Sequence, residues 1–159
     1  MQIDCQNEQW KEQPMADFEI KDPNFQERVR LAFHSQRFME HLGAELTLIG
    51  AGFCEIQLPF REELTQQNGF FHGGIIGTLA DNSMGFASFS LMGESDSVLT
   101  VEYKLNLVAP GQGEKLRARG EVIRPGRTLT VARADVFAVQ DGVEKLCASA
   151  QSTMMRITT

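Results

Sequence analysis

The sequence predicts an α+β domain in which one antiparallel sheet wraps around a single long helix, and two observations carry this prediction. Residues 66–91 form a loop followed by a helix that is apolar on nearly every side. Four segments with strand character then follow in close succession, and the short turns between them make them antiparallel neighbours. A helix that is apolar all round needs cover on every face, and a sheet wrapped around it supplies that cover.

The chain begins with an arm and a first helix. Residues 1–21 are polar and glutamine-rich, and we interpret them as a loose arm whose aromatic residues, Trp10 and Phe18, are available to dock on the body. Asp22-Pro23 is a helix start, with an N-cap followed by proline in the first turn. Apolar residues then recur at helical spacing as far as Gly43, where we expect the helix to end because glycine is typical of a helix C-terminus. We expect one domain, over residues 22–159.

A hairpin and the central helix come next. Residues 44–60 resemble two strands that turn at Ala51-Gly52. The loop 61–71 leads into the central helix, which we expect from about residue 72 to about residue 93.

The last four strands are predicted over residues 99–107, 114–124, 127–139 and 144–157. In the first of them apolar and polar residues alternate, which is typical of a half-buried strand. Its apolar face carries Leu99, Val101, Tyr103, Leu105 and Leu107. The third has small residues on one face, which would let a thick helix lie close: Ala132, Ala134, Val136 and Ala138.

One stripe of the central helix is unusual, because Gly73, Gly77, Asp81 and Gly85 recur every four residues and share a face. A glycine inside a helix costs about 1 kcal/mol relative to alanine, so something approaches this face closely. Either a ligand occupies it, with Asp81 as a functional carboxylate, or the glycines allow tight packing on a sheet while Asp81 caps a local backbone group. The stripe alone leaves both interpretations open.

Composition excludes several classes of function. The formal net charge is −6, from 21 acidic and 15 basic residues, which argues against general nucleic-acid binding and against adhesion to anionic membranes. Asp81 lies in the middle of the central helix, where a charge in a bilayer costs about 3 kcal/mol, so a soluble core helix is favoured over a membrane span. Three cysteines without metal spacing, and a start without a secretion signal, predict a cytoplasmic protein with free thiols.

The start of the central helix has the chemistry of an oxyanion site. Unpaired amides point out of a helix N-terminus, and in His72-Gly73-Gly74 the glycines leave them unobstructed. Gln66 adds an amide donor, and Asp81 is a candidate base or nucleophile. Gly73 and Asp81 are eight residues apart, which is about 12 Å along a helix. If both serve one reaction, the carboxylate comes from a second subunit, so the hypothesis requires at least a dimer.

A second candidate is a cluster of basic residues between positions 115 and 133, with Arg124 and Arg127 on either side of a tight turn. Such a cluster suits a phosphorylated ligand, but an exposed sheet face with solubilising charges is the competing interpretation. Other chemistries are less well supported, because the sequence has no G-x-S-x-G motif and no metal-ligand spacing of histidine, cysteine and aspartate.

Together these motifs resemble a known family. Gln66-x-x-Gly69-x-x-His72-Gly73-Gly74 followed by Leu79-Ala80-Asp81 resembles the hotdog-fold acyl-CoA thioesterases, in particular the PaaI-like group of the phenylacetate pathway. The segment from Thr100-Val101-Glu102 to Ala109-Pro110 matches that group's third strand, and residues 124–129 match its fourth turn. The resemblance covers about residues 40–157. Many PaaI-like members have asparagine in place of Gln66, whereas glutamine is typical of the 4-hydroxybenzoyl-CoA type.

The resemblance implies a hotdog fold, with five or six antiparallel strands around a central helix, and dimers that often become tetramers. It implies hydrolysis of an acyl-CoA thioester to the free acid and CoA. Gly73 and Gln66 would polarise the carbonyl, Asp81 of the partner subunit would activate water or attack, Thr100 would orient that water, and His72 would play an orienting role. Eight residues would line the CoA channel: Asn106, Val108, Ala109, Pro110, Arg124, Pro125, Gly126 and Arg127. CoA is part of the substrate, so no separate cofactor and no metal are expected.

Two alternative functions stay open: a hotdog hydratase acting on enoyl- or hydroxyacyl-CoA, and a non-catalytic acyl-CoA-binding protein. The sequence has no histidine after Asp81, which counts against the hydratase form with an Asp-x-x-x-x-His arrangement. The acyl group itself is not fixed. Five apolar residues suggest a pocket for aryl or medium-chain groups, although they would serve equally as core: Phe70, Phe71, Phe86, Phe89 and Met92.

Overall fold

The computed structural model describes residues 18–158. The elements follow one another as α1 (Phe25–His34), α2 (Arg37–Leu42), β1 (Glu45–Gly50), β2 (Phe53–Pro59), the short 3₁₀ helix η2 (Glu62–Leu64), α3 (Gly73–Phe89), β3 (Asp96–Leu107), β4 (Lys115–Pro125), β5 (Leu129–Gln140) and β6 (Val143–Thr158). The predicted order of elements is therefore confirmed, with α3 ending at Phe89, four residues before the expected end near residue 93.

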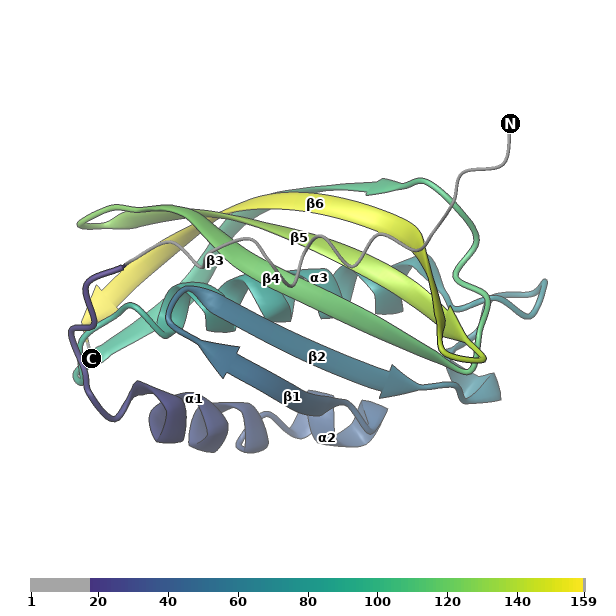
Figure 1. Ribbon diagram of the computed structural model, residues 1–159, viewed down its shortest axis with the longest axis horizontal. Helices are drawn as coiled ribbons and strands as arrows, with labels where there is room; N and C mark the ends of the chain where they lie inside the picture. The colour runs from purple at the N-terminus through teal and green to yellow at the C-terminus, as the bar shows by residue number, and fades with distance from the viewer. Residues whose placement is uncertain (1–17, 159) are drawn as a thin grey trace.

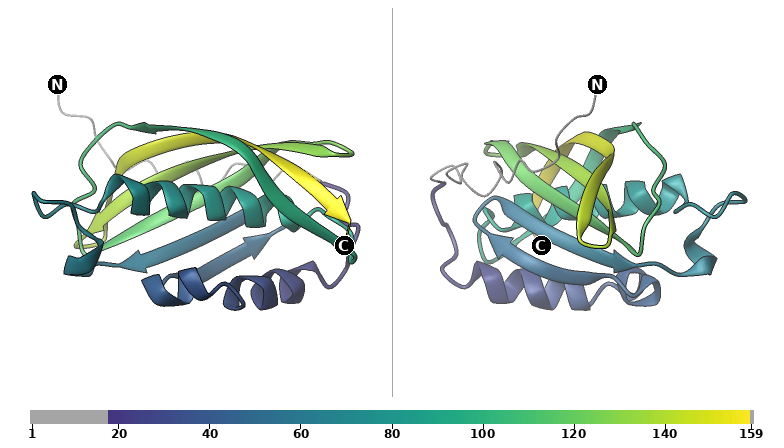
Figure 2. Two further views of the ribbon diagram at one scale, coloured as in Figure 1. Left: turned by 180° about the vertical axis from the view of Figure 1, so that it is seen from behind. Right: turned by 45° about the vertical axis from the view of Figure 1, so that its right-hand side comes forward.

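The six strands form one antiparallel sheet in the order β1-β2-β4-β5-β6-β3. The sheet arches over α3, and α1 and α2 lie along β1 (Figure 1). Seen from behind, α3 runs along the concave face of the sheet (Figure 2, left). β1 and β3 are the two edges. No helix within residues 18–158 is long and apolar enough to cross a bilayer.

The core lies between α3 and the sheet. The predicted small face of β5 is buried, and the helix comes closest at Gly120 of β4. A Cβ at Gly120 would lie 2.3 Å from the backbone carbonyl of Ser83, so only glycine allows α3 to approach β4 this closely.

The N-terminal helix differs from the prediction in two ways. It is broken at Ser35 and Gln36 into α1 and α2, and it begins at Phe25 after the N-cap position of Asn24. Asp22 is not the N-cap: its carboxylate accepts hydrogen bonds from the backbone N–H of Asn24, at 2.8 Å, and from the Nε of Arg28, at 2.7 Å. The predicted stop at Gly43 is confirmed by its left-handed φ of 74°.

The expected docking of the arm is confirmed for Phe18, whose ring packs against Gly52 in the β1–β2 turn. The expected docking of Trp10 falls outside the described residues.

The prediction of a half-buried β3 is wrong for a single protomer. Leu99, Val101, Tyr103 and Leu107 are between 43% and 55% exposed, because β3 is an edge strand with no neighbour on one side. The alternation is also interrupted by an irregularity between Thr100 and Glu102. Thr100 pairs with the buried Met154, and Tyr103 pairs with the buried Ser152, so both face α3, whereas Leu99 does not.

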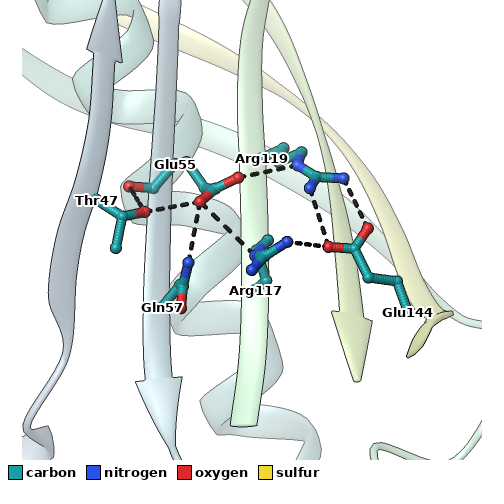
Figure 3. Close-up of polar contacts among 6 residues, drawn as sticks. All are labelled: Thr47, Glu55, Gln57, Arg117, Arg119 and Glu144. Atoms are coloured by element: carbon teal, nitrogen blue, oxygen red, sulfur yellow. Dashed lines mark hydrogen bonds and ion pairs between the residues drawn. The ribbon is translucent and has the colours of Figure 1, made fainter. Parts of the chain in front are cut away.

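The outer face of the sheet carries an ion network that joins β2, β4 and the start of β6 (Figure 3). The Nε of Arg119 donates to Glu55 at 3.0 Å, and its two terminal nitrogens donate to Glu144 at 2.9 and 3.0 Å. Arg117 also contacts both carboxylates, and Thr47 and Gln57 donate to Glu55. Arg119 and Glu55 are buried although they lie on the face away from α3. This network therefore has a structural role.

Candidate active site

The N-terminus of α3 is held in place by His72. The Nδ1 of His72 accepts a hydrogen bond from the N–H of Gly74 at 2.9 Å, and the His72 N–H donates to the carbonyl of Leu64 at 2.9 Å. An Nδ1 that accepts leaves the ring proton on Nε2. Gly73 is the first residue of the helix, so its N–H has no acceptor within the helix. His72 therefore caps α3 and leaves the amide of Gly73 as the available donor, while the orienting role of His72 in catalysis stays a prediction.

Gln66 lies in a tight turn next to this terminus. Thr65 forms a bridge with Phe71, and the backbone N–H of Gln66 donates to the carbonyl of Phe70 at 2.9 Å. The side-chain Oε1 of Gln66 accepts from the N–H of Asn68. Because the oxygen is engaged within the turn, the Nε2 group is left as the donor for a ligand.

Asp81 lies two helical turns further along α3, where it meets β3. The hydroxyl of Thr100 donates to Oδ1 of Asp81 at 2.8 Å. Burial raises the pKa of Asp81 above its ordinary value, and the hydrogen bond from Thr100 acts in the opposite direction. The β3 irregularity makes this contact possible because it turns Thr100 toward the helix. A β-bulge beside a functional group commonly has this effect.

Side chains of β3 fill the glycine stripe of α3. A Cβ at Gly73 would lie 3.0 Å from Leu107, and a Cβ at Gly77 would lie 3.2 Å from the hydroxyl of Tyr103. Gly73 and Gly77 thus serve helix–sheet packing, as one of the two open interpretations held, whereas Gly85 lines a cavity beside Asp81. Asp81 does not cap a backbone group in the way that interpretation supposed, because its partner is the side chain of Thr100.

A cavity of about 270 Å³ opens beside Asp81 and Thr100. Phe86 and Phe89 of α3 form its aromatic wall, and Val98 of β3 adds an apolar side chain. Of the five apolar residues expected in an acyl pocket, only these two phenylalanines line it. Three others lie elsewhere: Phe70, Phe71 and Met92.

The two groups of residues expected around CoA lie at opposite ends of one protomer. Thr100, Met154, Thr130 and Pro125 form one row across the sheet, which places the Arg124–Arg127 turn at the Asp81 end. This turn is three strand spacings from Thr100, about 14 Å. Leu107 and the residues after it lie at the Gly73 end instead. A single protomer therefore does not bring residues 106–110 together with residues 124–127.

Comparison with known proteins places the chain in a family. A family model of the thioesterase superfamily matches residues 68–145. A crystal structure of a thioesterase family protein from Silicibacter pomeroyi is 43% identical, with a TM-score of 0.83 over 85% of this chain and 99% of that one. The chain belongs to the thioesterase superfamily. As a member it is a thioester hydrolase with the hotdog fold.

Two further relatives of this thioesterase are informative. A 1,4-dihydroxy-2-naphthoyl-CoA hydrolase from Listeria monocytogenes is 25% identical over 115 residues, which are 72% of this chain and 91% of that one. The E. coli PaaI protein, from the phenylacetic acid degradation operon, has a TM-score of 0.76 over 87% of this chain and 96% of its own, at 17% identity. That second likeness concerns the fold, and it agrees with the PaaI-like motifs in the sequence.

The predicted site of the thioesterase thus falls into two halves. One contains Gln66, His72 and Gly73, and the other contains Asp81 and Thr100. Sequence reasoning missed Gln36, which lines the cavity from the break between α1 and α2, because no glycine or proline marks that break. Within residues 18–158 no three histidine, cysteine, aspartate or glutamate side chains group in a way that would hold a metal ion.

The basic cluster also divides. Arg117, Arg119 and Arg133 form ion pairs with glutamates on the outer face of the sheet, so these three follow the structural interpretation. Arg124 and Arg127 are exposed at the β4–β5 turn and have no ion-pair partner within residues 18–158. Among the five arginines of the cluster, only Arg124 and Arg127 stay candidates for phosphate.

Proposed function

We propose that this thioesterase hydrolyses an aryl- or medium-chain acyl-CoA to the free acid and CoA, at two sites that are each shared between two protomers. The observation that carries the proposal is the separation of two prepared half-sites. Gly73 offers an amide donor at the start of α3. Asp81 follows eight residues later in the same helix, about 12 Å from Gly73, and accepts a hydrogen bond from Thr100. Hydrolysis needs both the amide donor and the carboxylate. In a two-fold dimer, the Gly73 half-site of each protomer would meet the Asp81 half-site of the other.

The exposed edge of β3 supports such a pairing. It is a 12-residue strand, twice as long as β1 at the other edge. Its exposed residues include four large hydrophobic ones, which are Leu99, Val101, Tyr103 and Leu107. An edge of this kind is a template for pairing with another chain, and two copies would pair antiparallel in an isologous interface. If Asp81 of one helix meets Gly73 of the other, the two α3 helices cross at Gly77, midway between them. Tetramers are compatible with this arrangement, since they would add a second interface.

The proposed reaction needs only groups that such a dimer would hold. The amide of Gly73 and the Nε2 of Gln66 would bind the thioester carbonyl oxygen and stabilise the tetrahedral oxyanion, at about 3 kcal/mol per donor. Asp81 of the partner subunit takes a proton from a water that attacks the carbonyl carbon, with Thr100 of the partner subunit orienting carboxylate and water. The intermediate then collapses, the C–S bond breaks, and the CoA thiolate receives the proton. No metal or cofactor enters this sequence.

The proposed substrate spans both protomers. The cavity beside Asp81, about 270 Å³, would take the acyl group in the protomer that lends the carboxylate. In a dimer the Arg124–Arg127 turn of that protomer would approach residues 106–110 of the other, because each lies at the required end of the sheet. The two arginines would then be available to CoA phosphates. The buried, unpaired thiols of Cys54 and Cys147 support a reducing compartment such as the cytoplasm.

A screen of acyl-CoA esters for thiol release, with the wild type and Asp81→Asn in parallel, tests the proposal. We expect turnover of at least one aryl- or medium-chain ester by the wild type, and CoA-ester binding without turnover by the variant. Full hydrolysis by Asp81→Asn would reject the mechanism. Hydration of an enoyl-CoA without thiol release would favour the hydratase alternative, and binding without any reaction in the wild type would favour a non-catalytic binder.

A further inference from the structure

The cavity beside Asp81 extends along α3 as far as Phe89. The residues of α3 that line it lie on one face of the helix: Asp81, Asn82, Gly85, Phe86 and Phe89. Phe89 is eight residues beyond Asp81, which is about 12 Å along the helix. Among the α3 residues of the wall, it therefore lies furthest from the carboxylate.

The ring of Phe89 is covered by the guanidinium of Arg28, which comes from α1. The Cζ of Arg28 lies 4.1 Å from the centroid of the Phe89 ring, which is close enough for a cation–π attraction. Phe86 packs against the same ring at a steep angle, with the two centroids 6.4 Å apart. Arg28 does not itself line the cavity, so its effect there is exerted through the ring of Phe89.

Three hydrogen bonds fix the plane of this guanidinium. The Nε of Arg28 donates to the carboxylate of Asp22 at 2.7 Å. Its Nη2 donates to the carbonyl of Phe89 at 3.2 Å and to the carbonyl of Met92 at 2.7 Å. Both carbonyls lie at the C-terminal end of α3, where the helix dipole favours a cation. Lysine has no planar fork, so it cannot make all of these contacts while it covers the ring.

One nitrogen of Arg28 shows that the stacked position is imposed by these contacts. Its Nη1 is buried and has no hydrogen-bond partner within residues 18–158. A buried donor without a partner destabilises the fold, and a side chain free to turn would expose that nitrogen to water. The bonds to Asp22 and to the end of α3 therefore hold the guanidinium against Phe89, and they hold the ring in place with it.

We infer that Arg28 is a positioning residue for the substrate, because it fixes the ring of Phe89 as the end wall of the cavity. The inference rests on the proposed function, since it requires that the cavity beside Asp81 takes the acyl group. It concerns any acyl group long enough to reach Phe89. Because this wall is about 12 Å from Asp81, Arg28 affects the binding of such groups and leaves the chemical step unchanged.

The test compares decanoyl-CoA, whose extended acyl chain is about as long as the cavity, with butyryl-CoA, whose chain is too short to reach Phe89. Arg28→Lys keeps the positive charge at the end of α3 but loses the fork and the stacking. We expect its KM for decanoyl-CoA to rise about tenfold with kcat unchanged, because the end of the chain is bound equally in the ground state and the transition state. Both constants for butyryl-CoA should stay at their wild-type values.

Arg30→Lys is the matched control, since Arg30 is exposed on α1 and does not line the cavity, and it should leave both esters unaffected. If the wild type binds one of the esters without turnover, its inhibition constant against a hydrolysed ester replaces KM. Asp22→Asn is a second variant, which weakens the bond to the Nε of Arg28 and leaves the guanidinium in place. It should raise KM for decanoyl-CoA alone, by about threefold. It carries the test if thermal unfolding shows that Arg28→Lys is not folded.

A KM for decanoyl-CoA that stays at the wild-type value in the folded variant would overturn the inference while leaving thioester hydrolysis in place. An equal change for both esters, in KM or in kcat, would also overturn it, because a merely structural role of Arg28 does not distinguish long from short acyl chains. Absence of thiol release by the wild type from every ester of the wider screen would instead remove the proposed function, and this inference with it.

Discussion

Two effects act in opposite directions on the pKa of Asp81. Burial in the groove between α3 and β3 raises its pKa, and the hydroxyl of Thr100 partly offsets this by stabilising the ionised form. A carboxyl group whose pKa is raised is a stronger base than an exposed aspartate, which suits proton abstraction from water. Its ionisation in the folded protein also has a cost in stability.

Asp81→Asn should therefore separate activity from stability. Because the folded-state pKa of Asp81 is raised, its ionised form destabilises the fold at every pH above that pKa. Removing the charge should raise the Tm at neutral pH, while kcat falls by about 10²- to 10⁴-fold. Thermal unfolding and thiol-release assays on the same preparation measure both. A lower Tm together with lost activity would indicate damage to the fold and would contradict this account.

Thr100→Val tests the partner of Asp81. The variant loses the hydrogen bond that favours the carboxylate, so the pKa of Asp81 should rise further. The acidic limb of the kcat/KM–pH profile should then move to higher pH, with activity partly recovered as the pH increases. Thr153→Val is the control, since its hydroxyl bonds Glu102 on the other face of β3, and its profile should not move. An unshifted profile in Thr100→Val would mean that the limb reports another group.

Sequence reasoning singled out Asp81 because a charge in the middle of an apolar helix is conspicuous, and its catalytic role stays a prediction. It failed at Gln36 because a glutamine in a polar stretch carries no signal. The periodicity of β3 also hid the contact between Thr100 and Asp81, since strict alternation would have placed Leu99 and Val101 on the helix face in place of Thr100. Only the family resemblance put Thr100 in the site.

At the scale of elements, the N-terminus of α3 allows one backbone donor to be removed. Proline is tolerated at the first position of a helix and lacks an N–H, and the extended backbone of His72, with φ −62° and ψ 138°, suits a residue before proline. We expect Gly73→Pro to lower kcat by about 10²- to 10³-fold. Gly73→Ala is the control: it keeps the N–H, and its Cβ would meet only the flexible end of Leu107 at 3.0 Å. Equal loss in both variants would assign the effect to packing.

The outer network of the sheet predicts a pH dependence of stability. Burial alone would raise the pKa of Glu55, but hydrogen bonds from Thr47, Gln57 and Arg119 and the charge of Arg117 outweigh it and lower the pKa below 4.5. The stabilisation is complete above pH 4.5 and is lost as the pH falls through the lowered folded-state pKa.

Glu55→Gln should therefore lower the free energy of unfolding at neutral pH by about 3 kcal/mol and flatten its decrease in acid. Glu121→Gln is the matched control, because the pair of Glu121 with Arg133 is exposed, and it should cost less than about 1 kcal/mol. Urea unfolding at pH 7 and at pH 3.5 compares the three proteins. The assignment would be wrong if the two variants behaved alike.

Elements with strong periodicity were predictable, and their interruptions were not. The limits of α3 followed from its apolar run, and the tight turns at Gly52 and Gly142 followed from glycine, which is present with positive φ at both. Tertiary packing outweighs local preference at the Ser35-Gln36 break and at the irregularity of β3. No residue type at these positions therefore predicts the interruption.

At the scale of the whole molecule, the sequence predicted the sheet, its wrapping around α3 and the family. It did not predict the exposure of β3, because a strand alternates in the same way whether its apolar face is buried by its own chain or by another chain. The separation of Gly73 from Asp81 connects both observations. One half-site at the N-terminus of α3, a second at its midpoint, and a long edge strand with exposed hydrophobic residues alongside lead to the same expectation, a two-fold dimer with shared sites.

Subunit complementation between Asp81→Asn and Gly73→Pro tests this central claim most directly. Each variant alone should be nearly inactive. When equal amounts are unfolded, mixed and refolded, half of the dimers are mixed, and each mixed dimer has one site with both wild-type halves, so activity should return to about a quarter of the wild type. If the mixture stays as inactive as either variant while sedimentation shows that dimers have formed, Gly73 and Asp81 do not act across a subunit interface.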